Sequence, residues 1–212
     1  MRATFILFSL CLFATGCKDP GAEVTAAEVE SPAEAKAEPT PSAQPGSLQG
    51  TSAAISPSNS KIEFVGAKVT ASEPGGFTDF AGKVDVGDPI ETSKIEVTIQ
   101  TASLYTDKEK LTQHLKSPDF FDVAKFPTAT FRSAEITKTG DGHTISGDLT
   151  LHGVTKRISF PATIKAGTGE VTANAEFSID RHDYGISYPG MRDDLIRDLV
   201  VIKLSLKLPR SG

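Results

Sequence analysis

From residue 58 to the C-terminus, apolar and polar residues alternate with a period of two, and this pattern constrains the fold more than any other feature. Successive side chains of a strand point to opposite faces, so such alternation is typical of strands with one buried face. Tight turns such as the one at Thr139–Gly142 separate the stretches. Eight stretches of roughly ten residues are predicted as strands: KIEFVGAKVT, DFAGKVDV, KIEVTIQT, TATFRSAEIT, HTISGDLTLHG, KRISFPATIK, EVTANAEFSID and LVVIKLSLKL.

Eight antiparallel strands that each have one apolar face favour a closed barrel, because closure leaves no strand edge exposed to solvent. A sandwich of two sheets has the same pattern and remains an alternative. In TATFRSAEIT the pattern does not decide which face is buried. The sequence therefore predicts an all-β domain at residues 58–212, built as an extended eight-stranded antiparallel barrel.

A stretch without alternation separates the third and fourth predicted strands, and it indicates a short helix. Thr106 and Glu109 fit a capping box, in which the threonine caps the helix and the glutamate reaches back. Leu111 and Leu115 would then share one face of the helix. We predict a helical crossover between strands three and four.

The segment that follows, LKSPDFFDVAKFPTATF at residues 115–131, carries four of the twelve phenylalanines of the chain. Phe120 and Phe121 would either point into the barrel as part of a ligand wall or pack between the crossover and the outer surface of the barrel. The sequence leaves these two alternatives open. For Phe126 the packing role is favoured.

The predicted inward rows bear on whether the barrel is filled. An eight-stranded barrel is either filled by its own side chains or holds one small ligand. Small residues in mid-strand beside large ones would leave a long apolar cavity, but glycines also relieve barrel corners and small residues accommodate large neighbours. Both outcomes stay open. The small residues are Gly82, Gly147, Ala162, Ala173 and Ala175.

The loop between residues 184 and 197 is long and carries apolar bulk. Long loops between strands often carry function at a barrel mouth. This loop would therefore contribute to a binding site or act as a lid that closes the barrel end. Its large apolar residues are Tyr184, Ile186, Tyr188 and Met191.

The N-terminus has the pattern of a targeting segment. The apolar run from Phe5 to Phe13 follows Arg2 and is too short to span a bilayer. Ala14-Thr15-Gly16-Cys17 resembles the bacterial lipobox, so we predict a lipoprotein signal peptide at residues 1–16 and lipidation of Cys17. An ordinary signal peptide with an incidental cysteine is the alternative. Because Cys11 would be removed, lipidation explains an otherwise unpaired cysteine in an exported protein.

Residues 17–57 are rich in Ala, Pro, Glu and Ser and contain no aromatic residue. Such a segment buries too little apolar surface to offset its ordering entropy, so we predict a disordered tether after the lipidated cysteine. A flexible chain of this length spans roughly 35 Å. We expect an exported lipoprotein anchored in the cell envelope through acylated Cys17; Lys18 favours the outer membrane, facing the periplasm.

Composition and motifs argue against several functions. A net charge of −5 makes a nucleic-acid partner unexpected. The four histidines form no spaced metal-ligand motif, and no GxSxG elbow or phosphate loop is present. The Asp180–Asp183 cluster, DRHD, is the strongest candidate for catalysis, but neighbours on a strand face opposite ways, which favours a charged strand end. We predict no catalytic residue, no metal site, no cofactor and no enzymatic activity.

Three segments in order resemble the YceI-like family: LKSPDFFDVAKFPTATFRS, GDLTLHGVTKRISFPATI and FSIDRHDYGI. The resemblance covers about residues 60–208. It implies an extended, lipocalin-like barrel of eight antiparallel strands with a helical crossover, export to the periplasm, and binding of long isoprenoid lipids in the interior. Many members carry Asp-x-x-His-Ser near the first strand, whereas SNSKIEFVGAKVTASEPGGF lacks histidine. Head-group contacts from that strand are therefore not carried over.

Together these observations predict a membrane-tethered binding protein that sequesters or carries an apolar isoprenoid-like lipid, of polyprenyl or quinone type, inside the barrel. The alternative is a structural or interaction lipoprotein with a filled barrel and no small-molecule ligand. The predicted ligand-binding residues are Phe80, Leu115, Phe120, Phe121, Phe131, Leu149, Phe160, Phe177, Tyr184, Ile186, Tyr188 and Met191.

Overall fold

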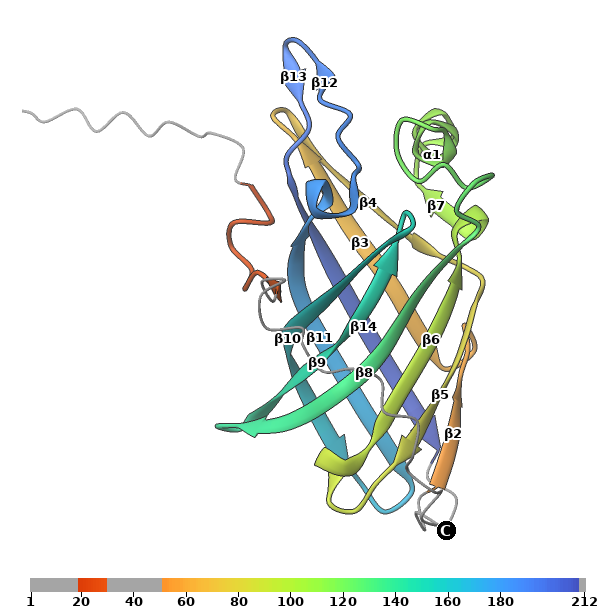
Figure 1. The fold of residues 1–212 in the computed structure, drawn as a ribbon, viewed down its shortest axis with the longest axis vertical. Helices are drawn as coiled ribbons and strands as arrows, with labels where there is room; N and C mark the ends of the chain where they lie inside the picture. The colour runs from red at the N-terminus through yellow and green to blue at the C-terminus, as the bar shows by residue number, and fades with distance from the viewer. Residues whose placement is uncertain (1–18, 30–50, 210–212) are drawn as a thin grey trace, which may run out of the picture.

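The computed structural model describes residues 19–29 and 51–209 (Figure 1). Within these residues the chain is mostly β-structure, with one α-helix and three short 3-10 helices. The strands are β1 (Glu28–Val29), β2 (Thr51–Ile55), β3 (Ser60–Lys68), β4 (Ala71–Phe77), β5 (Phe80–Val86), β6 (Lys94–Gln100), β7 (Leu104–Thr106), β8 (Thr128–Thr139), β9 (Gly142–Leu151), β10 (Val154–Ala166), β11 (Glu170–Asp180), β12 (Gly190–Met191), β13 (Asp194–Leu195) and β14 (Leu199–Pro209). The helices are α1 (Glu109–Lys116), η1 (Ile90–Thr92), η2 (Thr101–Ser103) and η3 (Arg181–Tyr184).

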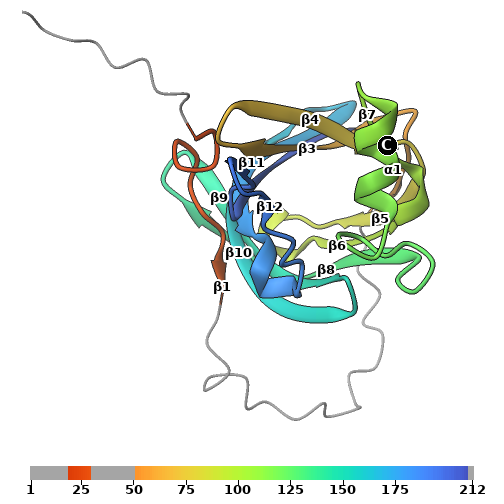
Figure 2. The same cartoon turned by 90° about the horizontal axis from the view of Figure 1, so that it is seen from above.

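One antiparallel sheet forms the body of the fold, in the order β2-β5-β6-β8-β9-β10-β11-β14-β3-β4-β7. Two residues separate β4 from β5, although β4 pairs with β3 and β5 pairs with β6 on the opposite side of the sheet. The sheet therefore curls back on itself around an interior, as the view from above shows (Figure 2). This confirms the all-β, antiparallel, barrel-like fold, with α1 as the helical crossover.

Each of the eight predicted stretches contains a strand, but the count of eight is not confirmed, because the sheet holds twelve strand segments. The four additional segments are β1, β2, β4 and β7. Of these, β4 has seven residues, as many as β5 and β6, and the other three are shorter.

Alternation explains the buried face of most strands. In β10, Ile158, Phe160 and Ala162 are buried and their neighbours are more exposed. At the end of the sheet that holds the C-terminal end of β14, residues of β2, β3, β5, β11 and β14 close the interior with a packed cluster. Its buried members are Ala53, Ile55, Ile62, Phe80, Val84, Val86, Val171 and Leu208.

A β-bulge settles the ambiguous face of β8. The register between β8 and β9 shifts between Ser133 and Glu135. Before the shift Ala129 and Phe131 face the interior, and after it Ile136 is buried. The extra residue changes the parity of the alternation, and for this reason no single period-two row fits the strand.

The capping-box prediction for the crossover helix is wrong. Helix α1 begins at Glu109, and its N-cap residue, Lys108, makes no side-chain capping bond. Thr106 belongs to β7, where its hydroxyl lies 2.9 Å from the Thr112 hydroxyl. The Glu109 carboxylate instead accepts a hydrogen bond from Gln113. Thr106 pairs with Gly75 of β4 and lies two residues before the N-cap residue, so it does not cap the helix.

Strands β10 and β11 pair only at one end, through Thr163–Ala166 and Val171–Asn174. Beyond that point residues 25–29 lie between them. Ala27 donates its backbone N–H to Ser178 of β11, and Ser178 donates its own to Thr25. β1 then pairs with Ile158 and Ser159 of β10. We call residues 19–29 the N-terminal strap.

The strap and β2 both fall in the segment 17–57, for which the sequence predicts a disordered tether. The predicted signal peptide, residues 1–16, and the predicted lipidation site, Cys17, lie outside the described residues. In the part of the chain that the structure describes, no helix has the length and apolar character needed to cross a membrane.

Candidate functional site

A cavity of about 840 Å³ lies inside the curled sheet. Its walls come from β3, β6, β8, β9, β10, β11 and β14, and helix α1 and the loop 185–196 border one end. The wall side chains are mainly apolar. Those of β6 and β14 are Ile95, Val97, Ile99, Val200, Ile202, Leu204 and Leu206.

The small residues singled out in the sequence divide into two groups. Ala162, Ala173 and Ala175 line the cavity, so their short side chains leave space beside larger neighbours. Gly82 and Gly147 serve close strand packing instead. A Cβ atom at Gly82 would overlap the carbonyl oxygen of Glu96, and one at Gly147 would overlap that of Arg132.

A row of aromatic rings forms one wall of the cavity. Phe160 and Phe177 are stacked, with ring centroids 4.2 Å apart and an interplanar angle of 12°. Phe131 lies against Phe160 with a centroid distance of 5.6 Å. These rings come from β8, β10 and β11, which are not paired with one another at these positions, so the rings meet inside the curve of the sheet.

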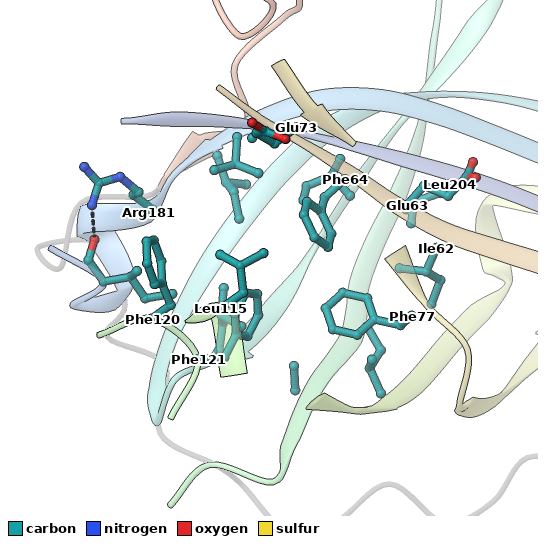
Figure 3. A pocket seen from close by; sticks show the side chains of 18 of the residues that line it. Ile62, Glu63, Phe64, Glu73, Phe77, Leu115, Phe120, Phe121, Arg181 and Leu204 are labelled. Carbon is teal, nitrogen blue, oxygen red and sulfur yellow. Dashed lines mark hydrogen bonds between the residues drawn. The ribbon is translucent and has the colours of Figure 1, made fainter. Parts of the chain in front are cut away.

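A second aromatic group comes from β3, β4 and the turn after α1. Phe77 lies 5.9 Å from Phe64 and 5.9 Å from Phe121, measured between ring centroids. Figure 3 shows these side chains and Leu115 around a common space. Gly75 makes room for this group, because a Cβ atom there would meet the Phe64 ring.

At the end near α1, three rings that line the cavity pack against one another. His114 of α1, Phe120 of the following turn and Tyr188 of the loop 185–189 have ring centroids 5.0–5.2 Å apart. Lys108 pairs with Glu73 of β4 at 2.5 Å and ties the start of α1 to the sheet. That hydrogen bond to Glu73 raises the pKa of Lys108. We call this end, which α1 and the loop 185–196 border, the mouth of the cavity; the lining residues Glu73 and Lys108 form their ion pair here.

A buried arginine holds the loop at the mouth. Arg181 is 5% exposed. Its guanidinium donates hydrogen bonds to the carbonyl oxygens of Ile186 at 2.8 Å and Arg197 at 3.1 Å, and to the carboxylate of Asp198 at 3.2 Å. Both ends of the loop are therefore fixed to one side chain.

The remaining members of the DRHD cluster have separate partners. The Asp180 carboxylate accepts from the backbone N–H of His182, and Asp183 pairs with Lys156. Within the described residues, no group of three or more His, Cys, Asp or Glu side chains is arranged to hold a metal ion. The cluster is arranged as a helix cap and ion pairs around η3.

The β12–β13 hairpin is tied to the connection between β3 and β4. The Asp194 carboxylate lies 2.6 Å from the Lys68 ammonium and accepts hydrogen bonds from the Thr70 backbone and hydroxyl. The hydrogen bond from Lys68, with those from Thr70, lowers the pKa of Asp194.

Two of the residues predicted from sequence do not line the cavity. Phe80 lies in the packed cluster at the closed end. Tyr184 is fully buried in the cluster behind the aromatic wall, and this burial, with the charge of Asp183, raises the pKa of its hydroxyl. A ligand role for the residues that do line the cavity stays a prediction. They are Leu115, Phe120, Phe121, Phe131, Leu149, Phe160, Phe177, Ile186, Tyr188 and Met191.

The phenylalanine-rich segment therefore divides by position. Phe120 and Phe121 line the cavity. Phe126 packs outside it, with its ring centroid 4.4 Å from that of His152, as the packing prediction for this residue requires.

Sequence reasoning missed Ile62, Phe64 and Phe77 as lining residues. The alternation in KIEFVGAK carried a signal for the first two. The sequence carried no such signal for Phe77, because its strand, ASEPGGF, shows no apolar alternation.

Comparison with known proteins identifies relatives. A family model described as the YceI-like domain matches residues 54–208. UPF0312 proteins of Pseudomonas putida (strain F1) and Pseudomonas fluorescens (strain SBW25) are each 40% identical over 125 residues, which is 55% of this chain. The aligned part spans 65% of the length of these relatives.

Solved structures share the fold. BcnA of Burkholderia cenocepacia superposes with a TM-score of 0.66 at 22% identity, covering 72% of this chain and 98% of BcnA. A polyisoprenoid binding domain from Saccharophagus degradans gives 0.62 at 16% identity, covering 77% and 100%. The Campylobacter jejuni YCEI protein gives 0.54 at 26% identity, covering 65% and 85%.

Proposed function

The chain belongs to the YceI-like family, and on this premise we propose that it binds an apolar lipid inside its curled sheet. The observation that carries the proposal is the cavity of about 840 Å³ with apolar and aromatic walls. Ligand pockets fall in a range of about 300–1,000 Å³ and are lined mainly by such side chains. The rival function, a scaffold with a filled barrel, requires an interior packed to the density of a protein core, which this cavity does not have.

The distribution of polar groups favours a chain-like ligand with its head group at the mouth. The β6, β10 and β14 walls present aliphatic and aromatic side chains, whereas the lining residues Glu73, Lys108 and Arg181 lie at the mouth, by α1 and the loop 185–196. Burial of apolar ligand surface at roughly 25 cal/mol per Å² would supply the affinity, less the costs of association.

An isoprenoid chain of polyprenyl or quinone type is the ligand class that we propose. The Saccharophagus degradans structure, which has the same fold, is of a polyisoprenoid binding domain. Stacked rings such as Phe160 and Phe177 offer flat apolar surface to an unsaturated chain.

We propose further that the protein is not an enzyme and that it acts as an exported lipoprotein. Cys17 would carry the acyl chains, and more than one chain is needed for stable anchoring. The small residues before Cys17 and the apolar run before them support this proposal. Lys18 favours the outer membrane, facing the periplasm.

Lipid extraction with mass spectrometry tests the binding proposal. Protein purified from its producing cells is expected to release a reproducible isoprenoid lipid. Ala175→Phe places a ring in the cavity and is expected to lower the lipid content, whereas Ala81→Phe places one on the exposed face of β5 and is expected to leave it unchanged. Protein that is always empty, and that fails to bind added polyprenyl or quinone compounds, would refute the proposal.

A further inference from the structure

Three exposed apolar residues lie on the β12–β13 hairpin and the adjoining β3–β4 connection, beside the mouth of the cavity. Met191 pairs with Asp194 and Leu195 pairs with Gly190, so these two side chains lie on opposite faces of the hairpin. Val69 is 43% exposed, Leu195 is 50% exposed and Met191 is 75% exposed. Val69 lies in the connection between β3 and β4, and its backbone N–H donates to the carbonyl oxygen of Leu195 at 3.1 Å. We call these three residues the apolar rim. In Figure 1 the β12–β13 hairpin stands at the end of the molecule opposite the C-terminus.

The rim is continuous with the cavity and firmly attached to the sheet. Met191 lines the cavity while most of its surface remains exposed. The ion pair between Lys68 and Asp194 joins the two connections, and a β-bridge links Lys68 to Ile196. Exposed apolar side chains on a fixed hairpin at a cavity mouth mark an interaction surface for an apolar partner.

The N-terminal strap brings the predicted anchor to the same end of the molecule. Asp19 lies 3.6 Å from Arg197, and Gly21 packs against Leu199. Arg197 is two residues after the rim residue Leu195, and its backbone N–H donates to Ala67 of β3. Cys17 precedes Asp19 by two positions, a separation that spans at most about 7 Å. Acyl chains on Cys17 would therefore leave the protein near the rim.

We propose that Val69, Met191 and Leu195 form a membrane-docking rim that inserts into the bilayer surface and holds the cavity mouth against it. A lipid ligand then passes between bilayer and cavity without exposing its chain to water. The inference rests on the proposed function, because it takes the ligand to be a lipid and Cys17 to be acylated.

The charges around the rim predict which bilayers it docks to. Lys68 and Arg192 are balanced by Asp193 and Asp194 on the same two connections. Attraction to anionic lipids requires an excess of basic residues, so the rim is expected to dock through apolar contact alone. Insertion should persist on zwitterionic vesicles and at high salt.

A depth measurement tests the docking. The processed, acylated protein is reconstituted into phosphatidylcholine vesicles whose acyl chains carry bromine, with an environment-sensitive fluorophore on Leu195→Cys or on Asp141→Cys. Asp141 lies in the β8–β9 turn, away from the mouth, and is exposed. We expect the bromines to quench the label at position 195 and not the label at position 141. Equal quenching at the two positions would overturn the docking and would leave the rim as a surface for a protein partner.

A transfer measurement provides the second test. Val69→Ser with Leu195→Ser removes apolar surface without changing a residue that lines the cavity. We expect transfer of a fluorescent quinone analogue from phosphatidylcholine vesicles to slow about tenfold, because insertion loses two apolar side chains. Affinity for the same analogue delivered from detergent should not change. Val29→Ser, at an exposed valine on β1, is the matched control; transfer at the wild-type rate in the double variant would overturn the proposal.

The two proposals can fail separately. The depth measurement needs no ligand, so a quenched label at position 195 in a protein without bound lipid would uphold docking and refute lipid carriage. A protein that carries lipid but whose label at position 195 is not quenched would uphold lipid carriage and refute docking.

Discussion

Arg181 offers a quantitative test of what holds the mouth of the cavity. Its guanidinium is buried and donates to the carbonyl oxygens of Ile186 and Arg197, and it also contacts the Asp198 carboxylate. Arg181→Met keeps an apolar stem of similar length and removes all these hydrogen bonds. Since the loop between these acceptors borders the mouth, we expect the variant to lose both stability and ligand retention.

The expected loss in the free energy of unfolding follows from the hydrogen-bond acceptors of Arg181. A hydrogen bond from a charged donor contributes about 1.5–3 kcal/mol, and the carbonyl oxygens of Ile186, Arg197 and, through a longer bond of 3.4 Å, Ile196 lose such a donor. Removing a buried charge also relieves its desolvation penalty, which offsets part of this loss. We expect the free energy of unfolding to fall by about 2–4 kcal/mol. Asp198→Asn is the comparison, and because the Asp198 side chain is 57% exposed, we expect less than about 1 kcal/mol.

Urea unfolding followed by far-UV circular dichroism measures both variants, since the chain has no tryptophan. A loss in Arg181→Met no larger than that in Asp198→Asn would refute the reasoning. It would mean that the exposed ion pair, and not the hydrogen bonds to backbone carbonyl oxygens, accounts for the role of Arg181.

Three further predictions concern other parts of the fold. Gly147→Ala should lower the free energy of unfolding by about 2 kcal/mol or more, because the new Cβ atom would overlap a neighbouring strand, whereas Gly169→Ala, with open space around it, should be neutral in the same urea titration. Ala27→Asp should cost about 1–3 kcal/mol by placing a carboxylate against the core, and Ala26→Asp, on the exposed side of the strap, should not; equal effects in thermal unfolding would contradict the strap placement. The pKa of Asp194 is lowered in the folded protein, so the stability that its pairing with Lys68 contributes is fully present above pH 3.8, the ordinary pKa. This contribution is lost as the pH falls through the lower pKa of the folded state. An NMR titration should show a midpoint below 3.8 that rises in Lys68→Met.

The sequence predicted the long strands because one face of each is buried, and burial imposes a period-two pattern. The pattern failed where a local feature changed it. In β8 the bulge at Ser133–Glu135 shifts the parity of the row. In β4 the residues ASEPGGF include Pro74, a residue type that is depleted in strands, and Gly75, which admits the Phe64 ring. Such features depend on neighbouring strands, which the sequence pattern does not name.

The sequence did not decide between a cavity and a filled barrel, for a related reason. Alanine and glycine occupy equivalent places in the inward rows, but they act differently. Ala173 and Ala175 leave empty space, whereas Gly82 and Gly147 are filled by the close approach of a neighbouring strand. The two cases can be distinguished only from the positions of neighbouring atoms: a small residue lies either beside empty space or against the backbone of the next strand.

The N-terminal strap shows the same dependence on distant residues, and it changes the expected reach of the anchor. The composition of residues 17–57 predicts a tether, because no local pattern offers a buried face. Residues 25–29 nevertheless have defined partners, since β10 and β11 separate and leave backbone groups that must be paired. A tether of about 40 free residues would let the domain move roughly 35 Å from the membrane. Because Asp19 lies beside Arg197, one residue, Lys18, separates the proposed anchor Cys17 from the strap, so acylation of Cys17 would keep the mouth of the cavity close to the bilayer surface.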